Sequence, residues 1–199
     1  MQIKTFPLIL GFFMLALSLQ AQKEETVLGH RGFGLTGIWG GSTHQLTQFG
    51  ATNSFVRGGH FALEFGKSFL IGLSNYKLAT DVKWDLVSNQ PFDMRWRTLK
   101  TGYAFKSYRA VHPLISVDAG PGRVKLENTR DNIFVIQPAA GLEFNIFRWF
   151  HLGLEGGYRF VTDSNIASLS DDNLSGPFGQ ATLRFGWSWG RYRSKSSRD

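Results

Sequence analysis

The side chains that could carry chemistry are histidines, carboxylates, lysines and arginines. The sequence contains no cysteine. A thiol nucleophile and a thiolate metal site are thereby excluded. Four histidines fall on different predicted elements, with neither the spacing of zinc ligands nor a nucleophile motif beside them. They are His44, His60, His112 and His151. We therefore expect no enzymatic activity, no cofactor and no bound metal.

Six charged residues recur on the polar side of alternating segments. They are Glu64, Lys100, Glu143, Glu155, Arg159 and Arg184. If those polar sides face one interior, the carboxylates should meet the basic groups, since an unpaired charge in a confined space is expensive. We predict that these six residues form a charge network inside the protein.

The segments that must position these charges alternate between bulky apolar and small or polar residues, the pattern of β-strands. In the clearest one, 150–162, Leu152 and Leu154 alternate with Gly153 and Glu155. Eight such segments are predicted, at 31–41, 55–66, 68–80, 95–106, 113–120, 133–147, 150–162 and 178–189. The phase of 68–80 is ambiguous. Pro138 cannot donate to a strand ladder, so we predict a bulge there, near the rim.

The connections between these segments alternate in length. Long polar connections are predicted at 42–54, 81–94, 121–132 and 163–177, and short ones at 66–67, 106–112 and 147–149. Long loops at one rim and tight turns at the other are typical of bacterial transmembrane barrels. The predicted fold class is thus all-β, an eight-stranded antiparallel up-and-down transmembrane β-barrel.

Composition favours a membrane exterior. Charged residues make up 19% of the chain and aromatic residues 15%, against about 25% charged residues in soluble domains. The bulky sides of the strands suit lipid, and aromatic residues near predicted strand ends suit the membrane interface. These are Trp149, Tyr158, Trp187 and Trp189. Alternation alone leaves a second interpretation open, a secreted soluble lipocalin-like barrel with an apolar ligand inside.

Both ends of the chain carry further signals. Residues 1–21 have a basic start, an apolar run and a small residue at the expected cleavage point, so they are predicted to be a signal peptide. The barrel is then expected at 22–190, followed by a basic tail at 191–199. The net charge of +7 is in part that of the tail, for which we expect solvent or lipid headgroups as surroundings and no nucleic acid.

Short glycine-led motifs also resemble a known family. They include Gly58-Gly59-His60-Phe61-Ala62-Leu63-Glu64, Gly141-Leu142-Glu143-Phe144-Asn145 and Gly156-Gly157-Tyr158-Arg159-Phe160. The chain resembles the porin-like outer-membrane barrels, which share an eight-stranded fold with the small outer-membrane protein A and X domains. The final strand departs from the family pattern, because a basic tail follows Trp189.

The expected function follows from this fold and location. We expect a monomer in the cell outer membrane, in contact with outer-membrane lipid, with a structural, interaction or narrow-pore role. The long loops are the expected binding sites for an extracellular or envelope protein partner. Because eight strands leave an interior just wide enough for side chains, we predict that the interior is plugged.

Overall fold

The computed structural model describes residues 34–50, 52–79, 82–84, 90–126, 129–166 and 169–189. The predicted signal peptide (1–21) and basic tail (191–199) lie outside the described residues. No helix within those ranges is long and apolar enough to cross a membrane.

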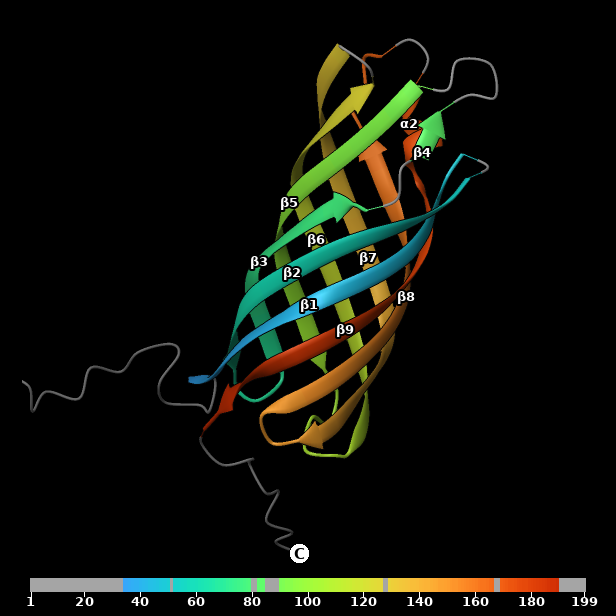
Figure 1. The fold of residues 1–199 in the computed structure, drawn as a ribbon. Helices are drawn as coiled ribbons and strands as arrows, with labels where there is room; N and C mark the ends of the chain where they lie inside the picture. Colours follow the sequence, from blue (N-terminus) through green and yellow to red (C-terminus); the bar gives the residue numbers. More distant parts are fainter. Residues whose placement is uncertain are drawn as a thin grey trace, which may run out of the picture. The chain divides into compact units, whose positions relative to one another are not determined.

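The described chain is almost entirely antiparallel sheet. Its strands are β1 (Leu35–Phe49), β2 (Thr52–Phe65), β3 (Phe69–Leu78), β4 (Val82–Trp84), β5 (Gln90–Ala104), β6 (Val111–Leu126), β7 (Thr129–Phe147), β8 (Phe150–Thr162) and β9 (Gly176–Ser188). One short helix, α2 (Asp171–Leu174), precedes β9. Figure 1 shows the strands tilted around a closed wall, with β4 and α2 at its upper end.

The wall closes because β1 pairs with both β2 and β9, while β3 pairs with β5. The short strand β4 pairs with the opening residues of β5, beyond the stretch of β5 that pairs with β3. Strands β3 and β4 therefore occupy one position in the wall. The barrel has eight strand positions, and the predicted eight-stranded up-and-down fold is confirmed.

One end of the barrel, here called the turn rim, carries the short connections 66–68, 105–110 and 148–149, as predicted. At the opposite end, the loop rim, the prediction of long loops is wrong at three places. Phe49 pairs with Thr52 across a turn in which Gly50 has a φ of 54°, a left-handed conformation that suits glycine. Leu126 pairs with Thr129, and β4 and β5 occupy much of 81–94.

The connection 163–175, which contains α2, is a long loop of the kind predicted, and residues 85–89 of the predicted loop 81–94 lie outside the described residues. The strands are accordingly longer than expected, up to 19 residues in β7, whereas about 9 to 11 tilted residues cross a bilayer. The predicted bulge at Pro138 is also wrong. Pro138 pairs with Val117, and β7 keeps its register with β8 on both sides of it.

The two faces of the wall differ in chemistry. Large apolar side chains are exposed on the outside, among them Phe61 (55%), Leu73 (67%) and Leu154 (47%). Aromatic side chains gather outside at the turn rim, where Trp149 and Phe185 stack 6.2 Å apart. The polar side chains of the same strands are buried inside. This is the reverse of what a soluble barrel with an apolar interior requires.

Candidate functional site

The candidate site is the interior of the barrel, where all six predicted network residues lie. Each has at most 8% of its surface exposed, and Arg159 has none. They come from five strands: Glu64 from β2, Lys100 from β5, Glu143 from β7, Glu155 and Arg159 from β8, and Arg184 from β9. The structure does not join them into one network but divides them among four groups of contacts.

The first group is centred on Glu143. Arg184 approaches this carboxylate with two nitrogens, Nη1 at 2.8 Å from Oε2 and Nη2 at 3.1 Å from Oε1. Two histidines also contact Oε1, His112 at 3.1 Å and His151 at 3.2 Å. The guanidinium of Arg184 lies 4.9 Å from the ring centre of Trp39. Three side chains thus hold one buried carboxylate, and the pair of Glu143 and Arg184 matches the predicted pairing of opposite charges.

The second group contains Lys100, which does not pair with any of the three predicted carboxylates. Its Nζ lies 2.8 Å from Oδ2 of Asp118 on the neighbouring strand β6. Thr98 donates to the other oxygen of Asp118 at 3.0 Å. Beside them, Glu155 accepts hydrogen bonds from Ser116 at 2.7 Å and from Gln180 at 2.8 Å. Neutral donors therefore satisfy Glu155.

The third group lies at the turn rim around Glu64. Its carboxylate accepts hydrogen bonds from Thr36, from the indole of Trp39 and from Ser188. Lys67, in the turn after β2, donates to the same Ser188 hydroxyl at 2.8 Å. Burial lowers the pKa of the Lys67 ammonium below its ordinary value, while the Glu64 carboxylate acts in the opposite direction. These contacts tie the turn after β2 to the start of β1 and to the end of β9, the two strands whose pairing closes the wall.

The fourth group holds Arg159 at the loop rim. Its guanidinium donates to the carbonyl of Leu174, to the hydroxyl of Thr47 and to the carbonyl of Gln48, all within 3.0 Å. The same group lies 4.0 Å from the ring centre of Phe49. Arg159 therefore links β8 to β1 and to the helix of the long loop, and a prediction of carboxylate partners for it was wrong.

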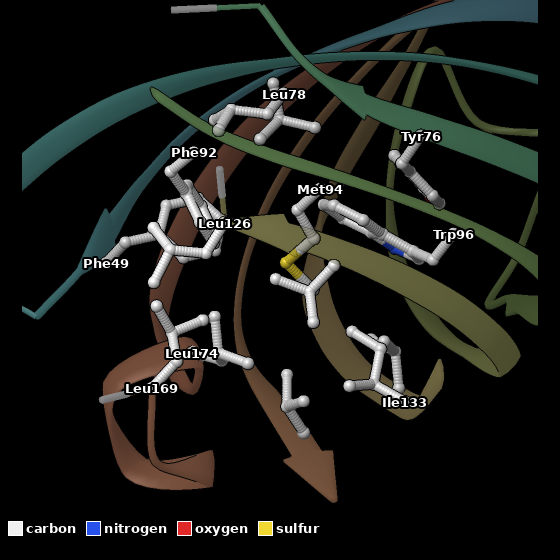
Figure 2. Close-up of a cluster of buried hydrophobic side chains, with 14 residues drawn as sticks. Phe49, Tyr76, Leu78, Phe92, Met94, Trp96, Leu126, Ile133, Leu169 and Leu174 are labelled. Carbon is white, nitrogen blue, oxygen red and sulfur yellow. The ribbon is translucent and has the colours of Figure 1, made fainter. Parts of the chain in front are cut away.

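Above the first three groups, and around Arg159, the interior is filled by apolar side chains, here called the apolar plug. It consists of Phe49, Val56, Tyr76, Leu78, Phe92, Met94, Trp96, Val124, Leu126, Ile133, Val135, Val161, Leu169 and Leu174. Figure 2 shows Phe49, Phe92 and Leu126 turned toward one another, with Leu169 and Leu174 of the long loop reaching in beside them. The indole of Trp96 donates to Gln137 at 2.8 Å, so its polar atom is satisfied inside the plug.

Within the described residues, the larger open space inside the barrel lies at the turn rim. A cavity of about 670 Å³ begins there, lined in part by Glu64, Lys67 and Tyr108, and reaches Arg184. Deeper, between Lys100 and Arg184, only about 20 Å³ is left, room for a single water molecule. The interior is thus a vestibule that ends on the Glu143 group, below the apolar plug.

Four ionisable members of these groups lie outside the predicted network, namely Lys67, His112, Asp118 and His151. Asp118 stood on the polar side of its predicted strand, so the alternation signal for it was present. His112 lies in a segment predicted to be a turn, whereas His151 lies on the polar side of the predicted strand 150–162, so the alternation signal for it was also present. Among the described residues, no cluster of three or more potential ligands is arranged to hold a metal ion.

Comparisons with known proteins bear on the fold. No family model matches the sequence, and no curated protein is similar to it. Among solved structures, Neisserial surface protein A is similar, with a TM-score of 0.56 and 12% identity over 77% of this chain and 96% of that one. The attachment invasion locus protein Ail of Yersinia pestis, crystallised with the heparin analogue sucrose octasulfate, has a TM-score of 0.46, 16% identity and coverage of 76% and 96%. The chain, with its eight strand positions, has the barrel fold of Neisserial surface protein A.

Proposed function

We propose that the protein is a monomeric outer-membrane barrel with a closed interior, which acts as a structural or interaction protein and not as an enzyme or an open channel. Its partners are membrane lipid along the wall and an extracellular or envelope protein at the loop rim. The observation that carries this proposal is the filled interior, in which the apolar plug stands above a vestibule closed by paired charges.

The outer face supports the membrane part of the proposal. On β6 the outward residues from Val111 to Pro121 are uncharged and mainly apolar. They span ten residue steps, about 33 Å along the strand and roughly 25 Å once the usual tilt is included. That height matches the apolar band of outer-membrane barrels. A patch of exposed apolar side chains around the whole wall would have no stable arrangement in water.

The patterning of β5 and β6 marks where this band ends. Along most of β5 the inside is polar and the outside apolar, as at Lys100 and Leu99. Toward the loop rim the pattern inverts, with Met94 buried inside and Arg95 exposed outside. The same inversion occurs on β6 between Asp118 and Val124. A strand that passes from lipid into water requires this change, because its outer surroundings become polar.

Partner binding at the loop rim is proposed for the connection 163–175. It is the longest described connection, and its helix α2 is held against the barrel through Leu169, Leu174 and the Arg159 guanidinium. A loop anchored in this way presents its outer residues in one conformation, which lowers the entropy lost when a partner binds. Asp172 and Asn173 lie on it.

Planar-bilayer recording tests the closed interior. We expect the purified, refolded protein to show small or no conductance. A double substitution that truncates two side chains of the plug, Phe49→Ala with Met94→Ala, should leave the charged vestibule intact and allow at most brief openings. A large, steady current from the unaltered protein would refute the proposal. In that case substitution of Arg184 should change the ion preference of the current.

A further inference from the structure

A row of like charges crosses the outer wall near the loop rim. Arg57 on β2 pairs directly with Lys77 on β3, Lys77 with Arg95 on β5, and Arg95 with Arg123 on β6. All four side chains are exposed on the outside of the wall. We call Arg57, Lys77, Arg95 and Arg123 the basic row.

This arrangement costs stability when nothing is bound to it. Neighbouring strands lie about 4.8 Å apart, and like charges directly opposite one another across two strands repel. Within the described residues, Asp93 is the one carboxylate in ion-pair distance of the row, at 3.4 Å from Arg95, in an exposed position. Three consecutive like-charge pairs with so little compensation point to an anion supplied by another molecule.

The wall beside the row is shaped to receive a ligand. A groove of about 460 Å³ runs along it, and Lys77, Arg95 and Arg123 line it together with Arg97. Pro121 and Gly122 of β6 also line it, and neither carries a long side chain. Beyond the groove, Lys125 and Arg130 form another pair of like charges across β6 and β7. The positive charge is therefore concentrated around one hollow.

The row lies where the apolar band ends. On β5 the exposed Leu99 is followed on the same face by Arg97 and Arg95, and on β6 the apolar stretch ends at Pro121, just before Arg123. The other side of the barrel has no such feature, because the described outer faces of β8, β9 and β1 carry no lysine or arginine. A general girdle of cations at the membrane interface would surround the whole barrel, whereas the basic row occupies one side of it.

We propose that the basic row binds the phosphate groups of an anionic lipid headgroup in the leaflet next to the loop rim. This inference rests on the membrane location in the proposed function. Guanidinium groups match phosphate oxygens in two-point hydrogen bonds, and cations on neighbouring strands, which lie about 4.8 Å apart, suit a headgroup with more than one phosphate. The position at the edge of the apolar band favours a lipid, whose chains lie along the wall, over a soluble polyanion.

The test uses the full chain in phosphatidylcholine nanodiscs, with diphosphoryl lipid A, monophosphoryl lipid A or no addition. Bound lipid is counted by native mass spectrometry, and thermal unfolding is followed in parallel. We expect the unaltered protein to retain diphosphoryl lipid A, to retain the monophosphoryl form less well, and to unfold at a higher temperature when either is present.

Three variants make the test specific. Arg95→Gln with Arg97→Gln and Arg123→Gln should reduce lipid A affinity about tenfold or more. The variant Arg95→Lys with Arg97→Lys and Arg123→Lys keeps the charge but lacks the planar guanidinium group. Its affinity for lipid A should fall between that of the unaltered protein and that of the glutamine variant. As a charge-matched control, Lys106→Gln with Arg109→Gln and Arg148→Gln removes three cations at the turn rim and should leave the affinity unchanged.

Each alternative outcome is distinct. Equal affinity for the glutamine variant and the unaltered protein would overturn the proposal. So would tight binding of sucrose octasulfate in detergent that matches the binding of lipid A, because the row would then serve a soluble polyanion. Without phosphorylated lipid the glutamine variant should be at least as stable as the unaltered protein, since repulsion is removed. Failure of the protein to enter bilayers would instead refute the membrane location itself.

Discussion

Removal of one carboxylate charge at mid-barrel should destabilise the protein more than loss of an ordinary hydrogen bond. Asp118→Asn keeps the size of the side chain and removes the charge that faces Lys100 at 2.8 Å. The side chains of Lys100 and Asp118 are 10% and 3% exposed, so bulk water cannot take the place of the lost partner. In the variant, the Lys100 ammonium group stays buried without its charged partner.

The expected cost follows from the contacts. Loss of one partner of a buried ion pair typically costs about 3 to 5 kcal/mol, because the other charge stays buried and uncompensated. Glu155 lies within electrostatic reach of Lys100 and offsets part of that cost, so we expect about 3 kcal/mol. Thr98→Val provides the matched control. It removes a hydroxyl that donates to the same carboxylate while the ion pair stays, and should cost about 1 kcal/mol.

Urea unfolding in phosphatidylcholine vesicles, followed by tryptophan fluorescence, measures both variants. A fall in the midpoint with an unchanged slope would report stability alone. The double variant Lys100→Met with Asp118→Leu should recover most of the loss, since well-packed apolar residues often replace a buried ion pair without cost. The reasoning is refuted if the free energy of unfolding of Asp118→Asn lies within about 0.5 kcal/mol of that of the unaltered protein. It is also refuted if the double variant is as unstable as Asp118→Asn.

Three further predictions use the same unfolding assay. Leu154→Arg should cost about 2 to 4 kcal/mol because it places a charge toward lipid, whereas Thr182→Ser, inside the barrel, should cost less than 1 kcal/mol; equal costs would mean that the faces are assigned wrongly. Gly141→Ala should be destabilised by about 1 to 3 kcal/mol, because its new Cβ would lie 1.9 Å from the Leu154 carbonyl, while Gly179→Ala meets nothing within 4 Å and should be neutral. Arg159→Met should cost about 3 kcal/mol and expose the loop at 163–175 to protease, and a loop that stays resistant would show that the guanidinium does not anchor it.

The sequence predicted the strand number and both faces of the membrane-crossing part, because there the surroundings impose strict alternation. Leu154 outside and Glu155 inside follow from that rule alone. The pairing of charges was less predictable, since alternation shows which residues face the interior and not which strands lie opposite. Lys100 on β5 meets Asp118 because β5 and β6 are neighbours in register, a relation that residue types do not encode.

The third strand shows why its phase was ambiguous. Leu73 faces outward and Tyr76 and Leu78 face inward, so the apolar side changes face within a single strand. A sequence pattern that assumes one apolar face along the whole strand does not fit such a strand, so its phase is ambiguous from the sequence. The same inversion explains the predicted loops at 81–94 and 121–132, where outward charges such as Asp93 and Arg123 resemble the polar residues of connections.

Inversion of the pattern also determines how the barrel is closed. Where lipid surrounds the wall, the interior can take polar residues because the outside supplies the apolar contacts. Above the band, water surrounds the wall, and the interior must become the hydrophobic core. Met94 and Val124 are therefore buried at the level where Arg95 and Arg123 are exposed. Extension of the strands beyond the bilayer thus produces two features together, the plug that seals the interior and the basic row on the outer wall, and a barrel cut back to the apolar band would lose both.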